Sequence, residues 1–180
     1  ILGLYERRGA QQYGSEAVSQ TEHALQCATL AAEGGAFDEL IAACLLHDVG
    51  HLIAEQPHGF ESTSDDAHQF LAIPFLRGAF CDAVLEPIRL HVEAKRFLCQ
   101  AEAGYWRRLS VASRRSLELQ GGRFSEIGAA RFLARPFSRD AIRLRRWDDQ
   151  AKVPGKSTPG LKDFAAVLRS LAQVDRQVAA

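Results

Sequence analysis

Hydrophobic positions recur at helical spacing along most of this chain. Between residues 16 and 33, Val18, Ala24 and Cys27 share one face with His23, and a Gly-Gly pair ends the pattern. Pro74 is expected to bend or interrupt the helix that contains it, whereas Pro87 fits the first turns of its own helix. The segments with this pattern are residues 1–12, 16–33, 39–49, 65–80, 81–92, 105–120, 124–133, 139–149 and 161–178.

No segment alternates between hydrophobic and polar residues as a strand would, and we find no internal repeat or linker. The pattern predicts an all-α protein: one compact, single-domain array of about eight to ten helices over residues 1–180. Residues 161–178 are expected to form its closing helix. Polar loops are predicted at 53–64 and 154–159.

Composition describes an ordinary globular protein. Of the 180 residues, 47% are apolar and 24% are charged, and 22 basic residues balance 22 acidic ones. This neutrality gives no reason to expect nucleic acid or an anionic membrane surface as a partner. No apolar run approaches the roughly 18 residues of a membrane span, and no signal-peptide pattern opens the chain. We therefore expect a cytoplasmic protein.

The four cysteines have no CxxC spacing, and each lies in an apolar or amphipathic stretch: Cys27, Cys44, Cys81 and Cys99. They are expected to be buried free thiols of a reducing compartment. The chain begins at Ile1 and contains no methionine, so the native N-terminus is expected to lie upstream.

The strongest chemical signal is the adjacent pair His47 and Asp48, which follows an apolar run and precedes Gly50. Adjacent residues on a helix point about 100° apart, so both can face one ligand only where a helix ends. A metal ion is the usual ligand for such a pair, since imidazole suits iron and zinc and a carboxylate can bridge two ions. The alternative is a buried histidine with an incidental aspartate neighbour.

The other histidines favour the metal. Four of the six histidines fall in predicted buried helices, each in a different one: His23, His47, His68 and His91. Any one of them alone is more often a core residue than a ligand. Because a buried imidazole needs a partner for each ring nitrogen, four of them together with an aspartate are difficult to explain by packing.

With Asp148 added, the order His…His-Asp…His…His…Asp resembles the HD-domain superfamily. The resemblance implies that His23, His47, Asp48 and Asp148 hold one metal, and that His68, His91 and a bridging Asp48 hold a second. Gln69 departs from the family, where His-Glu is common, so the affinity of the second metal is expected to be affected. His58 matches no family ligand and is expected to be a surface residue, or else part of a substrate lid.

Most HD-domain proteins are phosphohydrolases, but further segments are similar to the diiron HD-domain oxygenases that cleave the C–P bond of 2-amino-1-hydroxyethylphosphonate-type substrates. These segments are 13–16 (Tyr-Gly-Ser-Glu), 91–98, 117–122 and 145–152, so the similar region spans residues 13–152. The resemblance implies a mixed-valence pair of iron ions, Fe²⁺ and Fe³⁺.

The resemblance also implies roles around the metals. His51 and Lys95 would hold the phosphonate oxygens, helped by Arg145, Ser113, Ser116 and Gln120. Glu16 would face a substrate ammonium, primary or trimethylated. Tyr13 would cover the open iron position until substrate displaces it, so Tyr13, Asp48 and His51 are the candidate catalytic residues. The alternatives to these roles are that Lys95 is solvated, that Glu16 only stabilises a helix N-terminus through the helix dipole, and that Tyr13 is an ordinary aromatic residue of a surface loop.

The function that the resemblance implies is oxidative cleavage of a small 1-hydroxyphosphonate by O₂, which releases phosphate and a carboxylic acid. One alternative is an HD-type, metal-dependent phosphohydrolase that acts on a phosphate ester or nucleotide through metal-activated water. A second is a catalytically inactive HD binding module, which normally requires the loss of ligands. Turnover without O₂ would exclude the oxygenase.

Overall fold

The computed structural model describes residues 1–54 and 68–172, and within these ranges the chain forms eleven helices and no strand. The predicted all-α class is confirmed. The helices are α1 (Leu2–Arg8), α2 (Gln20–Glu33), α3 (Asp38–Leu46), α4 (Val49–Ile53), α5 (His68–Leu76), α6 (Asp82–Ala101), α7 (Tyr105–Arg108), α8 (Val111–Leu119), α9 (Glu126–Leu133), α10 (Ser138–Gln150) and α11 (Leu161–Leu171).

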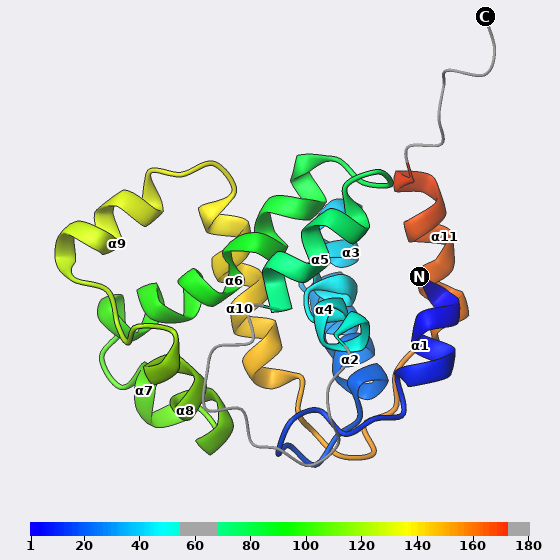
Figure 1. The fold of residues 1–180 in the computed structure, drawn as a ribbon, viewed down its shortest axis with the longest axis horizontal. Helices are drawn as coiled ribbons and strands as arrows, with labels where there is room; N and C mark the ends of the chain where they lie inside the picture. Colours follow the sequence, from blue (N-terminus) through cyan, green and yellow to red (C-terminus); the bar gives the residue numbers. More distant parts are fainter. Residues whose placement is uncertain (55–67, 173–180) are drawn as a thin grey trace, which may run out of the picture.

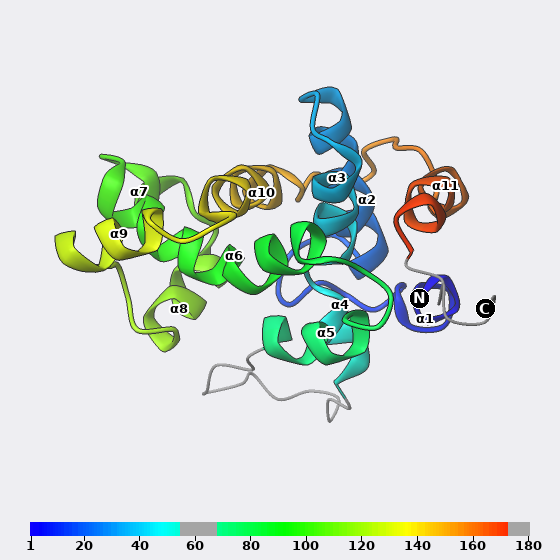
Figure 2. The same cartoon turned by 90° about the horizontal axis from the view of Figure 1, so that it is seen from above.

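The long helices α6 and α10 pack against each other through the middle of the molecule (Figure 1). Helices α2 and α3 form a pair beside them, and α4 and α5 pack together next to α6. Both views place α7, α8 and α9 at one end of the molecule and α1 and α11 at the other (Figure 2). The body between these ends is where α2 to α6 and α10 meet.

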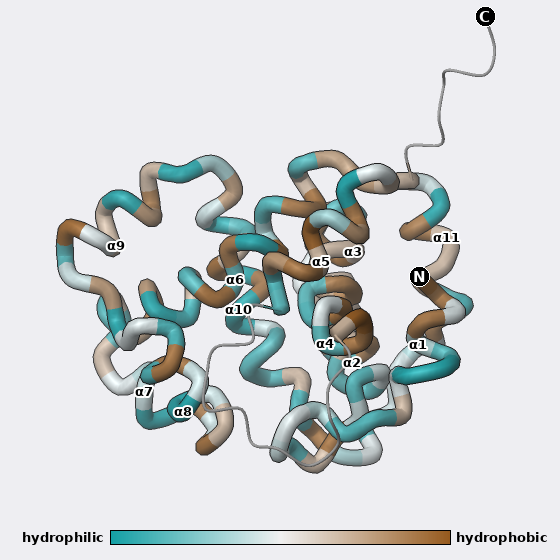
Figure 3. Tube along the Cα trace, in the orientation of Figure 1, coloured by the Kyte–Doolittle hydropathy of each residue, from teal (hydrophilic) through white to brown (hydrophobic). Residues whose placement is uncertain are grey.

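Helix α3 lies at the centre because it is apolar on every side. All seven residues from Leu40 to Leu46 are buried, and they belong to one core cluster with side chains of α2, α5 and α6. A helix that is hydrophobic all round must be enclosed by others. Helices α3 and α5 consist mostly of hydrophobic residues, whereas α10 is mostly hydrophilic and has one buried stripe (Figure 3).

The helix predicted over 39–49 is interrupted at its functional motif. Helix α3 ends at Leu46, Asp48 has backbone angles of φ −104° and ψ 11°, and α4 begins at Val49. This break lets the adjacent side chains of His47 and Asp48 turn toward the same place, which an unbroken helix would prevent.

Other predicted boundaries shift for local reasons. The helix predicted over 16–33 begins at Gln20, because Ser19 and Glu22 form a reciprocal capping box before it. The helix predicted over 105–120 is split into α7 and α8, because Ser110 caps α8 by accepting a hydrogen bond from Ser113 N. The helix predicted over 1–12 ends at Arg8, where Gly9 packs against Thr21.

Helices α9 and α10 agree with the predicted bounds within two residues, whereas α6 is much longer than predicted. Helix α6 continues past the predicted end at residue 92, so Lys95 lies on the same helix as His91. Positions 65–67 of the predicted helix 65–80, positions 173–178 of the closing helix and His58 lie outside the described residues. None of the described helices is long and apolar enough to cross a membrane. All four cysteines are free thiols, two buried and two half-buried.

Candidate metal centre

The structure brings together the six residues predicted as metal ligands, and all six are buried. Their ligand atoms form two groups, each with its atoms within 4.8 Å of one another: His23, His47 and Asp148 in one, Asp48, His68 and His91 in the other. They come from α2, the α3–α4 junction, α5, α6 and α10.

Backbone carbonyls orient three of the four imidazoles. Nδ1 of His23 lies 2.8 Å from Ala151 O, Nδ1 of His47 lies 2.9 Å from Cys44 O, and Nδ1 of His91 lies 2.7 Å from Ile88 O. A carbonyl only accepts, so each Nδ1 donates its proton and the Nε2 of the neutral ring is left with a lone pair. This tautomer is the one that binds a metal through Nε2.

Within each group two Nε2 atoms face each other. Nε2 of His23 lies 3.3 Å from Nε2 of His47, and Nε2 of His68 lies 3.1 Å from Nε2 of His91. In a buried pocket such a contact needs a proton or a metal ion between the two nitrogens, because two acceptors cannot bond each other. A cation between each pair would remove the conflict.

Asp48 lies between the two pairs. Its Oδ2 is 3.3 Å from Nε2 of His47 and 3.7 Å from Nε2 of His23, whereas its Oδ1 is 3.0 Å from Nε2 of His68 and 3.7 Å from Nε2 of His91. A carboxylate with one oxygen toward each histidine pair has the geometry of a bridge between two metal ions.

Two carboxylate oxygens in this pocket have no hydrogen-bond partner among the described residues: Oδ1 of Asp48 and Oδ1 of Asp148. Arg145 takes the other oxygen of Asp148 at 2.6 Å, and Oδ1 is thereby turned toward His23 at 3.5 Å. Buried oxygens without donors are costly, so the donor set fits metal ions better than it fits an empty pocket.

The electrostatics agree with this fit. Burial lowers the pKa of His23 to about 4 and that of His91 well below its usual value, so both rings are neutral ligands. Burial also lowers the pKa of His47, but the adjoining carboxylate of Asp48 outweighs it and raises the pKa to about 10. A proton on His47 neutralises the charge of Asp48, and a bound metal cation would take over this role.

Gly50 permits α4 and α5 to meet at this pocket. A Cβ atom at this position would lie 2.0 Å from the carbonyl oxygen of His68. Only glycine therefore allows the backbone that carries His68 to approach the His47-Asp48 turn.

Tyr13 covers one side of the centre. Its ring stacks on His23 at a centroid distance of 3.9 Å, and its hydroxyl bonds the Asp48 carboxylate. Burial, the charges of Asp48 and Asp148 and this bond raise the pKa of Tyr13 well above its ordinary value. His51 stacks on His68 at 4.1 Å and meets the edge of the Tyr13 ring.

A buried cationic wall adjoins the centre. Lys95 donates to Ser116 Oγ at 2.7 Å, and Arg145 lies 3.4 Å from Ser113 Oγ while it pairs with Asp148 and Asp149. The structure therefore brings together four of the predicted phosphonate-binding residues. Gln120 lies one turn beyond Ser116, at the C-terminal end of α8, where its backbone N–H donates to Ser116 O.

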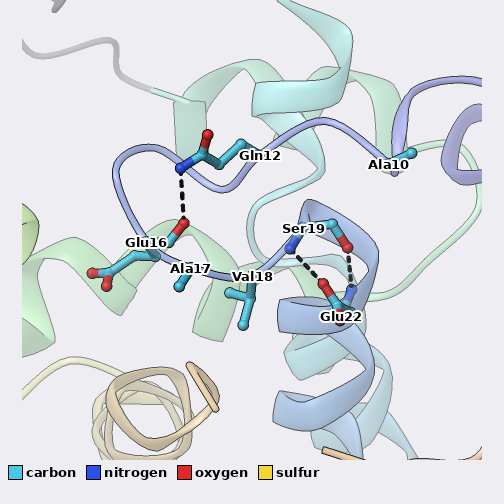
Figure 4. Close-up of a pocket in the computed structure, with 7 residues that line it drawn as sticks. All are labelled: Ala10, Gln12, Glu16, Ala17, Val18, Ser19 and Glu22. Atoms are coloured by element: carbon cyan, nitrogen blue, oxygen red, sulfur yellow. Dashed lines mark hydrogen bonds between the residues drawn. The ribbon is translucent and has the colours of Figure 1, made fainter. Parts of the chain in front are cut away.

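Glu16 belongs to the same turn as Tyr13. Its N–H donates to Tyr13 O at 2.9 Å, across Gly14, which has φ +56°. An open hollow of about 300 Å³ on this loop is lined by Ala10, Gln12, Glu16, Ala17, Val18, Ser19 and Glu22, and by none of the six clustered residues. The Glu16 carboxylate turns away from the capping box of Ser19 and Glu22 (Figure 4).

The sequence analysis assigned no role to Lys152, yet its ammonium lies at the centre of these contacts. It is 3.3 Å from Oε1 of Glu16, 3.0 Å from Ser113 Oγ and 5.6 Å from the centroid of the Tyr13 ring. The available signal was its place in segment 145–152, four residues after Asp148, where the sequence resembles the oxygenases.

An all-helical array whose separate helices converge four histidines and two aspartates on one buried pocket defines a protein of the HD-domain class. Comparison with known proteins identifies the family within this class to which the chain belongs. The chain is 44% identical to hydroxymethylphosphonate dioxygenase of Gimesia maris over 176 residues, which are 94% of this chain and 87% of that protein.

It is 35% identical to [1-hydroxy-2-(trimethylamino)ethyl]phosphonate dioxygenase (glycine-betaine-forming) of Leisingera caerulea over 181 residues, which are 100% of this chain and 91% of that protein. An uncharacterised protein of Acanthamoeba polyphaga mimivirus is 34% identical over 160 residues, 87% of this chain and 73% of its own length. No protein-family model matches the chain. The chain belongs to the HD-domain phosphonate dioxygenases, and the resemblance seen in its sequence is confirmed.

Proposed function

We propose that this protein is a diiron dioxygenase that uses O₂ to cleave the carbon–phosphorus bond of a small 1-hydroxyphosphonate. The observation that carries the proposal is the pair of buried His/Asp groups joined by Asp48, with a buried cationic wall beside them. The names of the two dioxygenase relatives support the same activity.

In this proposal His23, His47 and Asp148 would hold one iron ion, His68 and His91 would hold the other, and Asp48 would contribute to both. A mixed-valence Fe²⁺/Fe³⁺ pair would supply the redox chemistry with O₂, which redox-inert Zn²⁺ cannot provide. Arg145 positions Asp148 by holding one of its oxygens, so that the other stays directed at the metal.

Lys95 and Arg145 would neutralise the phosphonate dianion, because both are buried cations whose present partners include serine hydroxyls. Ser113, Ser116, Gln120 and His51 would supply further hydrogen bonds to the phosphonate oxygens. Exclusion of water from this wall strengthens each of these contacts.

Tyr13 would leave the centre when substrate binds. Its ring stacks on His23 and its hydroxyl is hydrogen-bonded to the Asp48 carboxylate. Tyr13 therefore covers the side of the pocket from which a chelating substrate would have to approach the metal ions. Stacking and one hydrogen bond are weak enough for a chelating dianion to replace them.

The overall reaction balances without an external reductant. One hydroxymethylphosphonate and one O₂ contain the atoms of one formate and one phosphate, as the C–P bond and a C–H bond at C1 are broken. The carbon is oxidised to a carboxylic acid and O₂ is reduced.

The test is phosphate release by the iron-loaded protein from hydroxymethylphosphonate, with O₂ consumption measured in parallel. We expect equal amounts of phosphate, formate and consumed O₂, and no phosphate in anaerobic samples. Phosphate release from simple phosphate esters or nucleotides without O₂ would instead identify a phosphohydrolase. Iron binding without turnover of any of these substrates would identify an inactive module.

A further inference from the structure

Tyr105 is a buried residue at the start of the short helix α7, beside the cationic wall. Its ring packs in a small core cluster with Leu98, Leu109 and Leu117. Leu98 belongs to α6 and Leu117 to α8, the two helices that carry the lysine and the serines of the wall. The ring alone supplies this packing, so the hydroxyl has a role that its own partners must explain.

The hydroxyl of Tyr105 connects Arg145 with Asp149. It donates a hydrogen bond to Oδ2 of Asp149, and it lies 3.4 Å from Nε of Arg145, which donates to it. Oδ1 of the same carboxylate accepts from Nη2 of Arg145. Burial raises the pKa of Tyr105 well above its ordinary value, so the phenol keeps the proton that it donates. The hydroxyl is thus inserted into what would otherwise be a two-point pair of Arg145 and Asp149.

This arrangement decides which edge of the Arg145 guanidinium faces the pocket. Tyr105 and Asp149 hold the edge formed by Nε and Nη2. The opposite edge reaches the pocket, where Nη1 lies 2.6 Å from Oδ2 of Asp148 and Nη2 lies 3.4 Å from Ser113 Oγ. The contact with Ser113 is long for a hydrogen bond, so the N–H there is available to a phosphonate oxygen. Because the guanidinium is planar with fixed donors, holding one edge also orients the other.

Without the hydroxyl, a competing arrangement opens to Arg145. Both oxygens of Asp149 would then be free to bond Nε and Nη2 directly, which is the preferred geometry of a guanidinium and a carboxylate. The side chains of Arg145 and Asp149 are only 6% and 18% exposed, so solvent screens their attraction weakly. The guanidinium would be drawn toward Asp149 and away from Ser113.

We propose that Tyr105 is a positioning residue for substrate binding, whose hydroxyl keeps the Arg145 guanidinium in the orientation that presents an N–H to the phosphonate beside Ser113. Tyr105 acts through Arg145 and touches neither the substrate nor a metal ion. The inference rests on the proposed function, since it concerns how the same site holds its anionic substrate.

The first experiment compares Tyr105→Phe with the unmodified protein, both loaded with iron and supplied with hydroxymethylphosphonate and O₂. We expect KM to rise about tenfold, because a charge-assisted hydrogen bond to the phosphonate is weakened. The value of kcat should stay within about twofold, because this bond is made equally in the ground state and the transition state. Anaerobic calorimetry with the same compound should show Kd raised by the same factor. Both ions should be retained, since the bond from Arg145 to Asp148 does not involve the hydroxyl.

Tyr5→Phe is the matched control. The hydroxyl of Tyr5 is also buried and donates to Leu45 O at 2.6 Å, with no contact to Arg145. Loss of this bond should lower the urea midpoint of unfolding at least as much as Tyr105→Phe does, because each variant loses one buried hydroxyl and keeps its ring. The KM of the Tyr5 variant should nevertheless equal that of the unmodified protein.

The second experiment repeats the change in an Asp149→Asn background. An amide has a single oxygen to accept with, so the direct two-point pair that would displace Arg145 cannot form. In this background, adding Tyr105→Phe should therefore raise KM by less than about twofold. A full tenfold rise here would overturn the inference, because the hydroxyl would then act independently of Asp149.

A merely structural role for Tyr105 predicts another result. In that case Tyr105→Phe would lower the urea midpoint as Tyr5→Phe does and leave KM and Kd unchanged, which overturns the inference. Loss of an ion from Tyr105→Phe would also overturn it, because the hydroxyl would then serve the ligand Asp148. These outcomes are read against an active unmodified enzyme. If the unmodified protein itself releases no phosphate under O₂, the proposed function is what fails.

Discussion

Single atoms decide the chemistry of this pocket. Each histidine pair presents two Nε2 atoms about 3 Å apart, and three of the four rings are held as Nδ1–H tautomers by backbone carbonyls. In a buried pocket such an arrangement is stabilised only by a proton or a metal ion between the two nitrogens. The roles of the ligands can therefore be separated by substitution.

Asp48→Ala should abolish binding of both ions, because each Asp48 oxygen faces one histidine pair. Asp148→Ala should lose mainly the ion of the His23–His47 group, since the other group stays intact. Metal analysis after gel filtration measures the stoichiometry. Asp149→Asn is the matched control, because Asp149 pairs with Arg145 and belongs to neither group. Two ions retained by the Asp48 variant would contradict the bridging assignment.

Lys95 should make substrate binding depend on pH. Burial and the nearby Arg145 lower the pKa of Lys95 to about 7, so in the free protein the ammonium is present below that pH and lost above it. A phosphonate dianion binds the ammonium form, so KM should rise by up to about tenfold per pH unit above the pKa. The measurement is a KM profile from about pH 6 to about pH 9.

Lys95→Arg is the control for this profile, because a guanidinium stays charged over the whole range. The variant should show no rise of KM that follows this titration. A flat profile for the unmodified protein would show that Lys95 does not hold the phosphonate as a titrating cation.

At the residue scale, the sequence predicted which side chains converge but not how they pair. His23, His47, Asp48, His68 and His91 could be found because each is a polar residue in a segment that must be buried, whereas Asp148 was found through the resemblance to the HD-domain superfamily. The contact of Glu16 with Lys152 joins two loops far apart in sequence, and no periodicity encodes it. The same holds for the hydrogen bond from Ser110 to Glu16.

Among the elements, two features bring the candidate metal ligands together: the turn between α3 and α4, and the close approach of α5 to α4. The adjacent side chains of His47 and Asp48 can converge only because both lie in the break between the end of α3 at Leu46 and the start of α4 at Val49. Helix α5 brings His68 to the same place over the bare Cα of Gly50.

Gly50→Ala should separate α4 from α5, because its Cβ would lie 2.0 Å from His68 O. We expect a loss of about 1–3 kcal/mol in the free energy of unfolding and weaker binding at the group that contains His68. Urea unfolding and metal titration measure the two effects. Gly78→Ala is the control, since a Cβ there meets nothing within 4 Å. Equal behaviour of the two variants would refute the packing argument.

Element prediction succeeded where apolar periodicity is long and failed where a short polar contact intervenes. Periodicity located α2, α6, α9 and α10 within a few residues of at least one end. The breaks at 47–48 and 109–110 escaped it, because helix-compatible residues occupy both sides. Ser110 followed by Ser113 was a usable capping signal that the periodic pattern obscured.

On the scale of the whole molecule, we expect bound metal ions to stabilise the fold. Its ligands come from α2, the α3–α4 junction, α5, α6 and α10, which are the elements that form the central body. Without metal ions, two Nε2···Nε2 contacts and two carboxylate oxygens without donors among the described residues would stay buried. The folded state should therefore be considerably less stable without metal.

Chelation should lower the melting temperature by on the order of 10 °C, and re-addition of Fe²⁺ should restore it. Calorimetry at fixed protein concentration measures the shift. The Asp48→Ala variant provides the reference, because a protein that binds no ion should melt at the same temperature with and without chelator. A chelator-insensitive melting temperature in the unmodified protein would show that the ions contribute nothing to the fold.

The bonds of His47 and His91 to carbonyls three residues earlier have one more consequence. The orientation of each of these imidazoles is set by a hydrogen bond within its own helical turn. It therefore does not depend on contacts with distant parts of the chain. A metal ion would therefore bind to side chains that are already in the required rotamers. If the ion dissociated, these two rings would keep their orientation and another ion could bind in its place.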